Sequence, residues 1–298
     1  KILLGSLAGS GTLGLLIPPS IILIIYGVTV QESIAKLFIA GIIPGIMIAL
    51  IFMSYVIIWS LINKDKMPKI VEEYSFLEKI KRSKQLLPVI LLISAVIGSI
   101  YTGIATATEA ASLGVVGALI LSYFQKSLTL QTFKSSLLGA TKTSCMIAFI
   151  LAGSTFLSLA MGFTGLPRNL AIWIQSMDLS PYVLILVLMI FYIILGMFLD
   201  GISAVVLTMA IIEPMIRQAG FDMIWFGIFL VIVVEMAQIT PPVGFNLFVL
   251  QGMANKDMGY IARSAFPLFI LMIFAVILVV IFPEIALWMP EKMVQNLN

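Results

Sequence analysis

Two pairs of adjacent prolines lie inside long apolar stretches, one at Pro18–Pro19 and the other at Pro241–Pro242. Proline lacks an N–H and its ring clashes with the preceding helical turn, so each pair leaves backbone carbonyls without a helical donor. In an apolar medium such groups are costly unless another group satisfies them. Because hard cations prefer oxygen ligands, the two pairs predict helix breaks that can hold an ion such as Na⁺.

Polar residues accompany both proline pairs. The first pair follows "GSLAGSGTLG" at residues 5–14, whose small residues and hydroxyls permit a close backbone approach. The second pair lies among four polar residues in an apolar run: Glu235, Gln238, Thr240 and Asn246. We expect Thr240 to contribute an ion ligand. Three roles stay open for Glu235: membership of the site, a place at an interface, or a local pair.

Asp200 is the one aspartate well inside an apolar region, within "LDGIS" at residues 199–203. Ionisable residues inside membrane segments are functional sites by default. We expect Asp200 to orient ligands or to cap the half-helix beyond it, and Ser203 to offer a second hydroxyl ligand. Glu213 is interpreted as interfacial, and Glu109 as a helix cap or scaffold contact.

The elements that must position these residues are membrane helices. Of the 298 residues, 61% are hydrophobic and 10% are charged, and the mean hydropathy is +1.16, whereas soluble domains are about 25% charged. The sequence therefore predicts an all-α polytopic membrane protein. Apolar runs fall at residues 2–27, 37–62, 87–104, 111–124, 144–163, 182–199, 203–216, 224–254 and 264–288.

Several function classes are disfavoured by what the sequence lacks. There is no histidine and only one cysteine, Cys145, whereas intramembrane zinc and serine–histidine proteases need histidine. An aspartyl protease needs two buried aspartates, and only Asp200 qualifies. A channel would call for a ring of charged side chains. We therefore expect no enzyme, no cofactor beyond a coupling ion and no nucleic-acid partner.

Charge is concentrated between the apolar runs. Residues 64–87 carry seven basic side chains against four acidic ones, and their apolar spacing predicts an interfacial amphipathic helix. By the positive-inside rule this linker is cytoplasmic, as are the loops predicted at 126–142 and 256–263. These loops account for the net charge of +3.

Two runs do not have the length of a simple span. Residues 203–216 make about 21 Å of helix, short of a hydrocarbon core of about 30 Å. We expect them to form a re-entrant hairpin with 182–199 that turns at Asp200 and Gly201. The run 224–254 is about 46 Å long as a helix, so it must unwind, and the proline pair marks the place.

The two halves of the chain resemble each other internally. An offset of 223 residues carries the first proline pair onto the second and Pro44 onto Pro267. The charge rule gives the two proline segments opposite directions, so the repeats are predicted to be inverted. Inverted repeats with helices broken near the midplane are typical of secondary transporters, with substrate and ion bound at the breaks.

At these residues the sequence resembles the large membrane subunit of the tripartite ATP-independent periplasmic (TRAP) transporters, especially its sialic-acid branch. The matching stretches are "GTLGLLIPPSIILIIYG" (11–27), "LFIAGIIPG" (37–45), "TATEAAS" (106–112), "GMFLDGISAVVLTMAIIEPMI" (196–216) and "ITPPVGFNLFVL" (239–250). The resemblance implies an elevator-type Na⁺ symporter of the bacterial inner membrane for a small acid, here sialic acid. It also implies a small four-helix membrane (Q) subunit, separate or fused, and a periplasmic substrate-binding (P) protein.

In such proteins a hairpin tip and the adjacent helix break share each Na⁺ site. Carried onto this sequence, the resemblance implies Na⁺ ligands at Gly9, Ser10, Gly11, Thr12, Pro18, Gly201, Ser203, Ala237, Gln238, Thr240 and Pro241. The substrate is expected beside Asp200, Pro19, Pro242 and Asn246. Sodium is the only metal expected.

The predicted organisation has three parts. Residues 1–63 end the first repeat, 64–87 form the linker, and 88–298 hold the second repeat with scaffold spans at 88–163. By repeat symmetry about 135 residues, including a first hairpin, are expected to precede this chain. Two functional alternatives stay open: a TRAP permease for C4-dicarboxylates or another carboxylate, and a Na⁺/dicarboxylate carrier that needs no binding protein.

Overall fold

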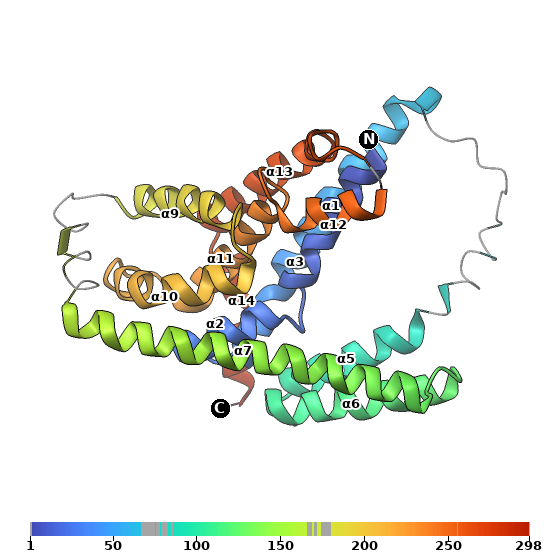
Figure 1. The fold of residues 1–298 in the computed structure, drawn as a ribbon, viewed down its shortest axis with the longest axis horizontal. Coiled ribbons are helices and arrows are strands. Elements are labelled where there is room, and N and C mark those ends of the chain that lie inside the picture. The colour runs from blue at the N-terminus through green and yellow to red at the C-terminus, as the bar shows by residue number, and fades with distance from the viewer. Residues whose placement is uncertain are drawn as a thin grey trace.

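The computed structural model describes residues 2–66, 86–165, 180–254 and 256–297, with the isolated positions 75, 78, 83, 84, 169, 172 and 173 between them. Every regular element in these residues is a helix (Figure 1). The all-α class is therefore confirmed. The interfacial helix predicted at 64–87 lies mostly outside the described residues, which show one short 3₁₀ helix there, η1 (Lys64–Lys66).

The helices are long and apolar enough for a polytopic membrane protein. Among the described residues, five could each cross a membrane by length and composition: α3 (Ile34–Ile62), α6 (Ala107–Phe124), α7 (Leu130–Thr164), α10 (Gly201–Gln218) and α13 (Met258–Ile281). A sixth crossing arises if α1 (Ile2–Leu16) and α2 (Ile21–Val30) form one span bent by 40°. The shorter helices are α5 (Leu87–Tyr101), α9 (Pro181–Gly196), α11 (Met223–Gln238), α12 (Phe245–Ala254) and α14 (Glu284–Leu297).

Both proline pairs interrupt helices, as predicted. The first pair lies between α1 and α2, and the second lies between α11 and α12. Each break joins helices of nearly the same lengths, 15 and 10 residues in the first case and 16 and 10 in the second. A long helix with an internal proline follows each time, Pro44 in α3 and Pro267 in α13. The structure thus supports an internal repeat, while its inverted sense stays a prediction.

Helices α9 and α10 form a hairpin whose tip, residues 197–200, points toward the middle of the molecule (Figure 1). The hairpin was predicted, but the length estimate for its second arm was wrong. Helix α10 has 18 residues rather than 14, so it is about 27 Å long. Its length alone therefore does not exclude a full crossing.

Two other boundaries also differ from the prediction. The loop expected at 126–142 is largely helical, because α7 starts at Leu130 after Thr129 caps its first turn. The last span, expected at 264–288, ends at Ile281, because Pro283 has no N–H to continue the helix and α14 starts beyond it.

Helix α11 is the centre of the fold. All of its residues are buried, and it contacts α1, α2, α3, α9, α10, α12, α13 and α14. Helix α7 is the opposite case: its surface is almost wholly exposed, and its Ser154 hydroxyl donates a hydrogen bond of 2.7 Å to the Val206 carbonyl of α10. The pair α5–α6 contacts α3.

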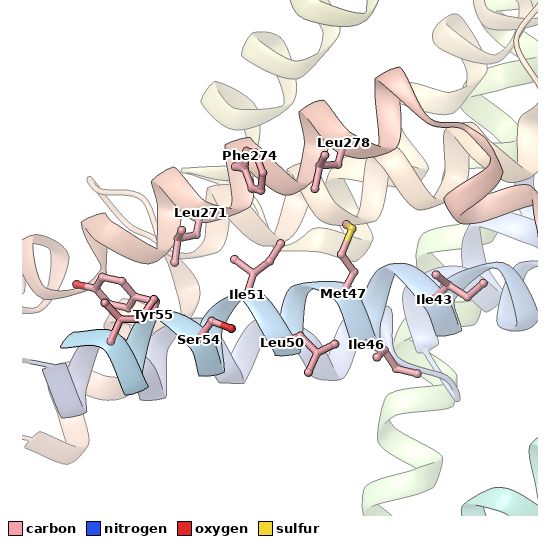
Figure 2. A pocket seen from close by; sticks show the side chains of 11 residues that line it. Ile43, Ile46, Met47, Leu50, Ile51, Ser54, Tyr55, Leu271, Phe274 and Leu278 are labelled. Atoms are coloured by element: carbon pink, nitrogen blue, oxygen red, sulfur yellow. The ribbon is translucent and has the colours of Figure 1, made fainter. Parts of the chain in front are cut away.

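The two proline-bearing helices enclose an apolar groove. Helices α3 and α13 lie side by side over a hollow of about 680 Å³ (Figure 2). Its lining includes Ile43, Met47, Ile51, Leu271, Phe274 and Leu278. These corresponding elements of the two repeats therefore meet through side chains rather than through a polar seam.

Candidate ion and substrate site at the helix breaks

The hairpin tip lies against elements of both breaks. A Cβ atom placed on Gly201 would lie 2.7 Å from Ile22 Cδ1 of α2 and 3.0 Å from Gln238 Nε2 of α11. At Gly196 an added Cβ would lie 2.6 Å from Ala237 Cβ. These distances are shorter than ordinary carbon contacts, so both glycines are needed for the tip to reach the helices.

One backbone hydrogen bond joins the second break to the tip. The Gly244 N–H donates to the Met197 carbonyl at 3.3 Å. Gly244 has φ +50°, and an added Cβ would lie 2.8 Å from the Thr240 carbonyl oxygen and 3.1 Å from that of Gln238. Two carbonyl oxygens of the break therefore converge on this glycine. Sequence reasoning did not single out Gly244 or Met197, although a glycine directly after a proline pair was a readable turn signal.

Asp200 caps α10. Its carboxylate accepts hydrogen bonds from the Ile202 N–H at 3.1 Å, the Ser203 N–H at 3.2 Å and the Ser203 hydroxyl at 2.5 Å. Of the two roles predicted for this aspartate, capping is confirmed. The carboxylate is exposed at the tip, and its bonds fix the Ser203 hydroxyl in place.

The hydroxyls of both breaks donate to their own helices. Thr240 Oγ1 donates to the Met236 carbonyl at 2.7 Å, and Thr12 Oγ1 donates to the Gly9 carbonyl at the same distance. Ser10 is exposed and donates to the Leu7 carbonyl at 3.3 Å. A hydroxyl oxygen that donates its proton keeps lone pairs for a cation. Thr240 and Thr12 are therefore chemically able to serve as ligands.

The first break is packed more tightly than the second. Ser20 accepts from the Leu23 N–H at 3.3 Å and donates to the Leu15 carbonyl. The Leu16 carbonyl faces Gly41 of α3, where an added Cβ would lie 2.7 Å from its oxygen. Helix α3 thus covers this break, whereas Pro241 and Pro242 are exposed.

The predicted residues of the first break point to different neighbours. Pro18 is buried, whereas Pro19 is exposed and lines an apolar hollow shared with α5 and α6. Gly9 packs against Leu268 of α13, on a different helix from the hairpin tip. Gly11 is close to the second break: an added Cβ would lie 3.7 Å from Asn246 Nδ2 of α12. Asn246 Nδ2 is buried and has no hydrogen-bond partner among the described residues.

Three glutamates show three different situations. Glu109 forms a capping box with Thr106 at the start of α6, as one of its predicted roles required. Glu213 pairs with Arg217, with 2.9 Å between Oε1 and Nε. Glu235 is fully buried, and neither of its oxygens has a hydrogen-bond partner in the part of the chain that is described. An interfacial place and a local pair are thus both excluded for it within these residues.

Arg217 ties the hairpin to the first repeat. Besides Glu213, its guanidinium donates to the Val30 carbonyl at 3.0 Å and lies 3.5 Å from Glu32 Oε1. These contacts join the outer end of α10 to the end of α2. The hairpin and the second half of the first broken helix are therefore connected at both the tip and the base.

Comparison with known proteins matches this arrangement to one family. Residues 4–285 fit the family described as the tripartite ATP-independent periplasmic transporter, DctM component. The chain is 32% identical to the C4-dicarboxylate TRAP transporter large permease protein DctM of Pseudomonas aeruginosa, over 96% of this chain and 67% of that protein. It is 31% identical to the sialic acid TRAP transporter large permease protein SiaM of Vibrio cholerae, again over 96% and 67%. It is 30% identical to the isethionate TRAP transporter permease protein DctMQ of Oleidesulfovibrio alaskensis, over 94% of this chain and 44% of that protein.

Proposed function

Because this chain belongs to the DctM family of TRAP transporter components, which are transporters of the bacterial inner membrane and not enzymes, we propose that it couples Na⁺ entry to the uptake of a small organic acid. The observation that carries this proposal is the junction of hairpin tip and second break. There the Gly244–Met197 hydrogen bond holds the tip next to converging carbonyls of an interrupted helix. Such a junction can bind an ion and close the tip in one step.

For the Na⁺ site at the second break, we propose oxygens of Ala237, Gln238, Thr240 and Pro241, completed by Gly201 and Ser203 of the tip. The convergence of the Gln238 and Thr240 carbonyls and the positioned Ser203 hydroxyl support this assignment. A second Na⁺ site at the first break would use oxygens within residues 9–12 and Pro18. Its support is the repeat relation and the hydroxyl of Thr12.

For the acid, we propose the start of α12 as the anion-binding element. The N–H groups and dipole of a helix N-terminus favour a carboxylate, and the unpartnered Asn246 amide adds a buried donor. Pro19 and Pro242 would lie at the edges of this site. Asp200 shapes the tip through its capping bonds and so sets how the tip closes over the acid.

Sialic acid is the first substrate we propose to test, and a C4-dicarboxylate is the second. Relatives at 31% and 32% identity are named for these two substrates. Both are organic acids, which the proposed helix N-terminus accepts on the same physical grounds. Relative uptake rates will separate them.

We propose two protein partners, a small Q subunit and a periplasmic P protein. A relative named DctMQ extends well beyond the region matched here, which is consistent with a Q subunit that is fused in some members. The long exposed side of α7 offers an apolar surface to lipid or to that subunit. Helices α5, α6 and α7 would form the scaffold, against which the hairpin and the broken helices move as an elevator.

The test is uptake of labelled sialic acid and succinate into proteoliposomes that hold the full-length subunit with its small partner. Uptake that needs both an inward Na⁺ gradient and the periplasmic protein supports the proposal. Na⁺-driven uptake without the periplasmic protein would instead show a carrier of the independent type. Uptake indifferent to Na⁺ would remove the ion assignment.

A further inference from the structure

Glu235 is a buried acidic side chain to which the proposed transport site assigns no task. It lies in the last turn of α11, three residues before the helix ends at Gln238. Its exposed fraction is 0%, and neither carboxyl oxygen has a hydrogen-bond partner among the described residues. Within those residues, the only other buried side-chain atom in this condition is Asn246 Nδ2.

The internal repeat provides a comparison position for Glu235. The offset of 223 residues that relates the proline pairs brings Thr12 of α1 onto Glu235 of α11. Thr12 is equally buried, but its hydroxyl is satisfied by the Gly9 carbonyl. A self-satisfied hydroxyl therefore suffices at this place in a broken helix. Packing alone gives no reason for the second repeat to hold a carboxyl there.

An ionised carboxylate at this place would be strongly disfavoured. A buried charge without a partner costs far more than a buried neutral group. The last turn of a helix adds to the cost, because its free carbonyls form the negative end of the helix dipole. The carboxyl must therefore bind a cation whenever the site is closed.

A proton is the cation that the surroundings favour. Metal cations of the hard class require several oxygen ligands, and the described residues contain no group of three acidic, histidine or cysteine side chains that could hold a metal. A proton requires a single oxygen. The exposed prolines of the break lie beyond Ile239, whereas Glu235 is enclosed one turn further in.

No neighbouring titratable side chain forms a hydrogen bond with Glu235. Within the described residues, α1 and α12 contain no titratable group. The tyrosines on the helices packed against α11 are Tyr26, Tyr55, Tyr182, Tyr192 and Tyr260, of which Tyr26 donates to the Met223 carbonyl and Tyr192 bonds with Thr208. The charged residues on α3, α10, α13 and α14 are Lys36, Glu213, Arg217, Arg263, Glu284, Glu291 and Lys292.

The hairpin tip controls access to this part of α11. An added Cβ on Gly201 would lie 2.9 Å from Val234 Cγ1 and 3.0 Å from Gln238 Nε2, residues that flank Glu235 in sequence. When the tip separates from α11, the end of this helix loses its cover. Water can then reach the carboxyl and exchange a proton with it.

We propose that Glu235 is a proton-binding site, protonated while the hairpin tip is packed on α11 and deprotonated to bulk water when the tip opens. The step is a single proton transfer: the carboxylate takes H⁺ from water on the open side to become a carboxylic acid and returns it on reopening. The bound proton follows from the geometry alone. Its cycling rests on the transport function proposed above.

Infrared spectroscopy tests the bound proton without any need for transport. The full-length subunit with its small partner is purified at neutral pH, and the C=O stretch of protonated carboxylic acid is compared in H₂O and D₂O. Wild type and the control Glu284→Gln, which removes an exposed carboxyl, should both show a D₂O-sensitive band. Glu235→Gln should lose it. Carboxylate bands in its place, especially ones that shift on addition of Na⁺, would overturn the proposal in favour of an ion pair.

Two further samples keep the test decisive if Glu235→Gln fails to fold. In wild type grown with carboxyl-¹³C glutamate, the band should shift as a glutamic acid band must, which identifies its source without a substitution. Glu235→Asp should keep an acid band at a changed frequency. A band insensitive to the glutamate label would refute the assignment to Glu235.

The cycling is tested by proton movement during uptake. Proteoliposomes that take up sialic acid or succinate are filled with a pH-sensitive dye, and the dye response is followed as uptake begins. Wild type and Glu284→Gln should change the internal pH with uptake, and Glu235→Gln should lose this response. If wild type moves no protons while the infrared band is present, the proton is fixed and the cycling is wrong. If no uptake occurs at all, the proposed function fails separately, and the infrared result still decides the bound proton.

Discussion

The Gly244 N–H of the second helix break donates a hydrogen bond to the Met197 carbonyl at the hairpin tip, over 3.3 Å. The bond joins residues 47 positions apart by their numbers and places the tip where the helix is interrupted. An ion held by the carbonyls of the break is therefore connected directly to the segment that closes the site.

Gly244→Ala is expected to weaken this junction more than its backbone conformation alone would require. Alanine at a positive φ costs about 1–2 kcal/mol, and here its Cβ would also lie 2.8 Å from the Thr240 carbonyl oxygen. The control is Gly220→Ala, which has φ +81° and nothing within 4 Å of the added Cβ. We expect at least a tenfold further loss of apparent Na⁺ affinity in uptake for Gly244→Ala, about 1.4 kcal/mol. Equal affinities in the two variants would contradict the carbonyl assignment.

Gly201→Ala is expected to keep the tip from seating between the two breaks. Its Cβ would lie 2.7 to 3.0 Å from Ile22, Val234 and Gln238, and overpacking of this kind costs about 1–3 kcal/mol. Thermal unfolding and uptake should both decline. Gly139→Ala on α7, where nothing lies within 4 Å, should be neutral or slightly stabilising. A stable and active Gly201→Ala protein would show that the tip has another resting place.

Thr240→Val and Ser203→Ala are expected to lower the apparent Na⁺ affinity of uptake. Each removes a hydroxyl proposed as a ligand while keeping a similar shape. Thr141→Val is the matched control, because Thr141 on α7 makes the same kind of bond, to the Leu137 carbonyl at 2.8 Å, on an exposed surface. Unchanged Na⁺ dependence in both site variants would show that these hydroxyls are not ligands.

Arg217 is expected to add modest stability through its two glutamate partners. Because its side chain is 46% exposed, each ion pair is worth about 0.2–1 kcal/mol after solvent screening. Double-mutant cycles of Arg217→Ala with Glu213→Ala and with Glu32→Ala will measure the two couplings by thermal unfolding. The coupling with Glu213, at 2.9 Å, should exceed that with Glu32, at 3.5 Å. The reverse order would mean that Arg217 binds α2 more strongly than its own helix.

The features that sequence reasoning predicted correctly follow from local chemistry. Each proline pair interrupts its helix, because the missing N–H and the ring act within one turn. Asp200 caps α10, because an aspartate directly before a run of helical residues meets their free N–H groups. The capping box of Thr106 and Glu109 has the same local origin.

The features that were missed depend on contacts between distant residues or on polarity that hydropathy misreads. Residues 130–142 are too polar to count as a membrane run, yet they continue a helix capped by Thr129 and Thr132. That Gly201 meets Ile22 is a tertiary fact that no local rule contains. The isolation of Glu235 likewise depends on eight helices that surround α11.

The complete burial of α11 has a consequence for how the protein assembles. A helix this apolar is as compatible with lipid as with protein, so aversion to water does little to draw it into the centre. Close fit must do so instead, and the glycines facing it permit that fit: Gly227 admits Tyr26, Gly196 admits Ala237 and Gly201 admits Val234. Assembly in the membrane is therefore expected to be selective for shape. Small added volumes on this helix should slow the maturation of the protein well before they change the polarity of any segment.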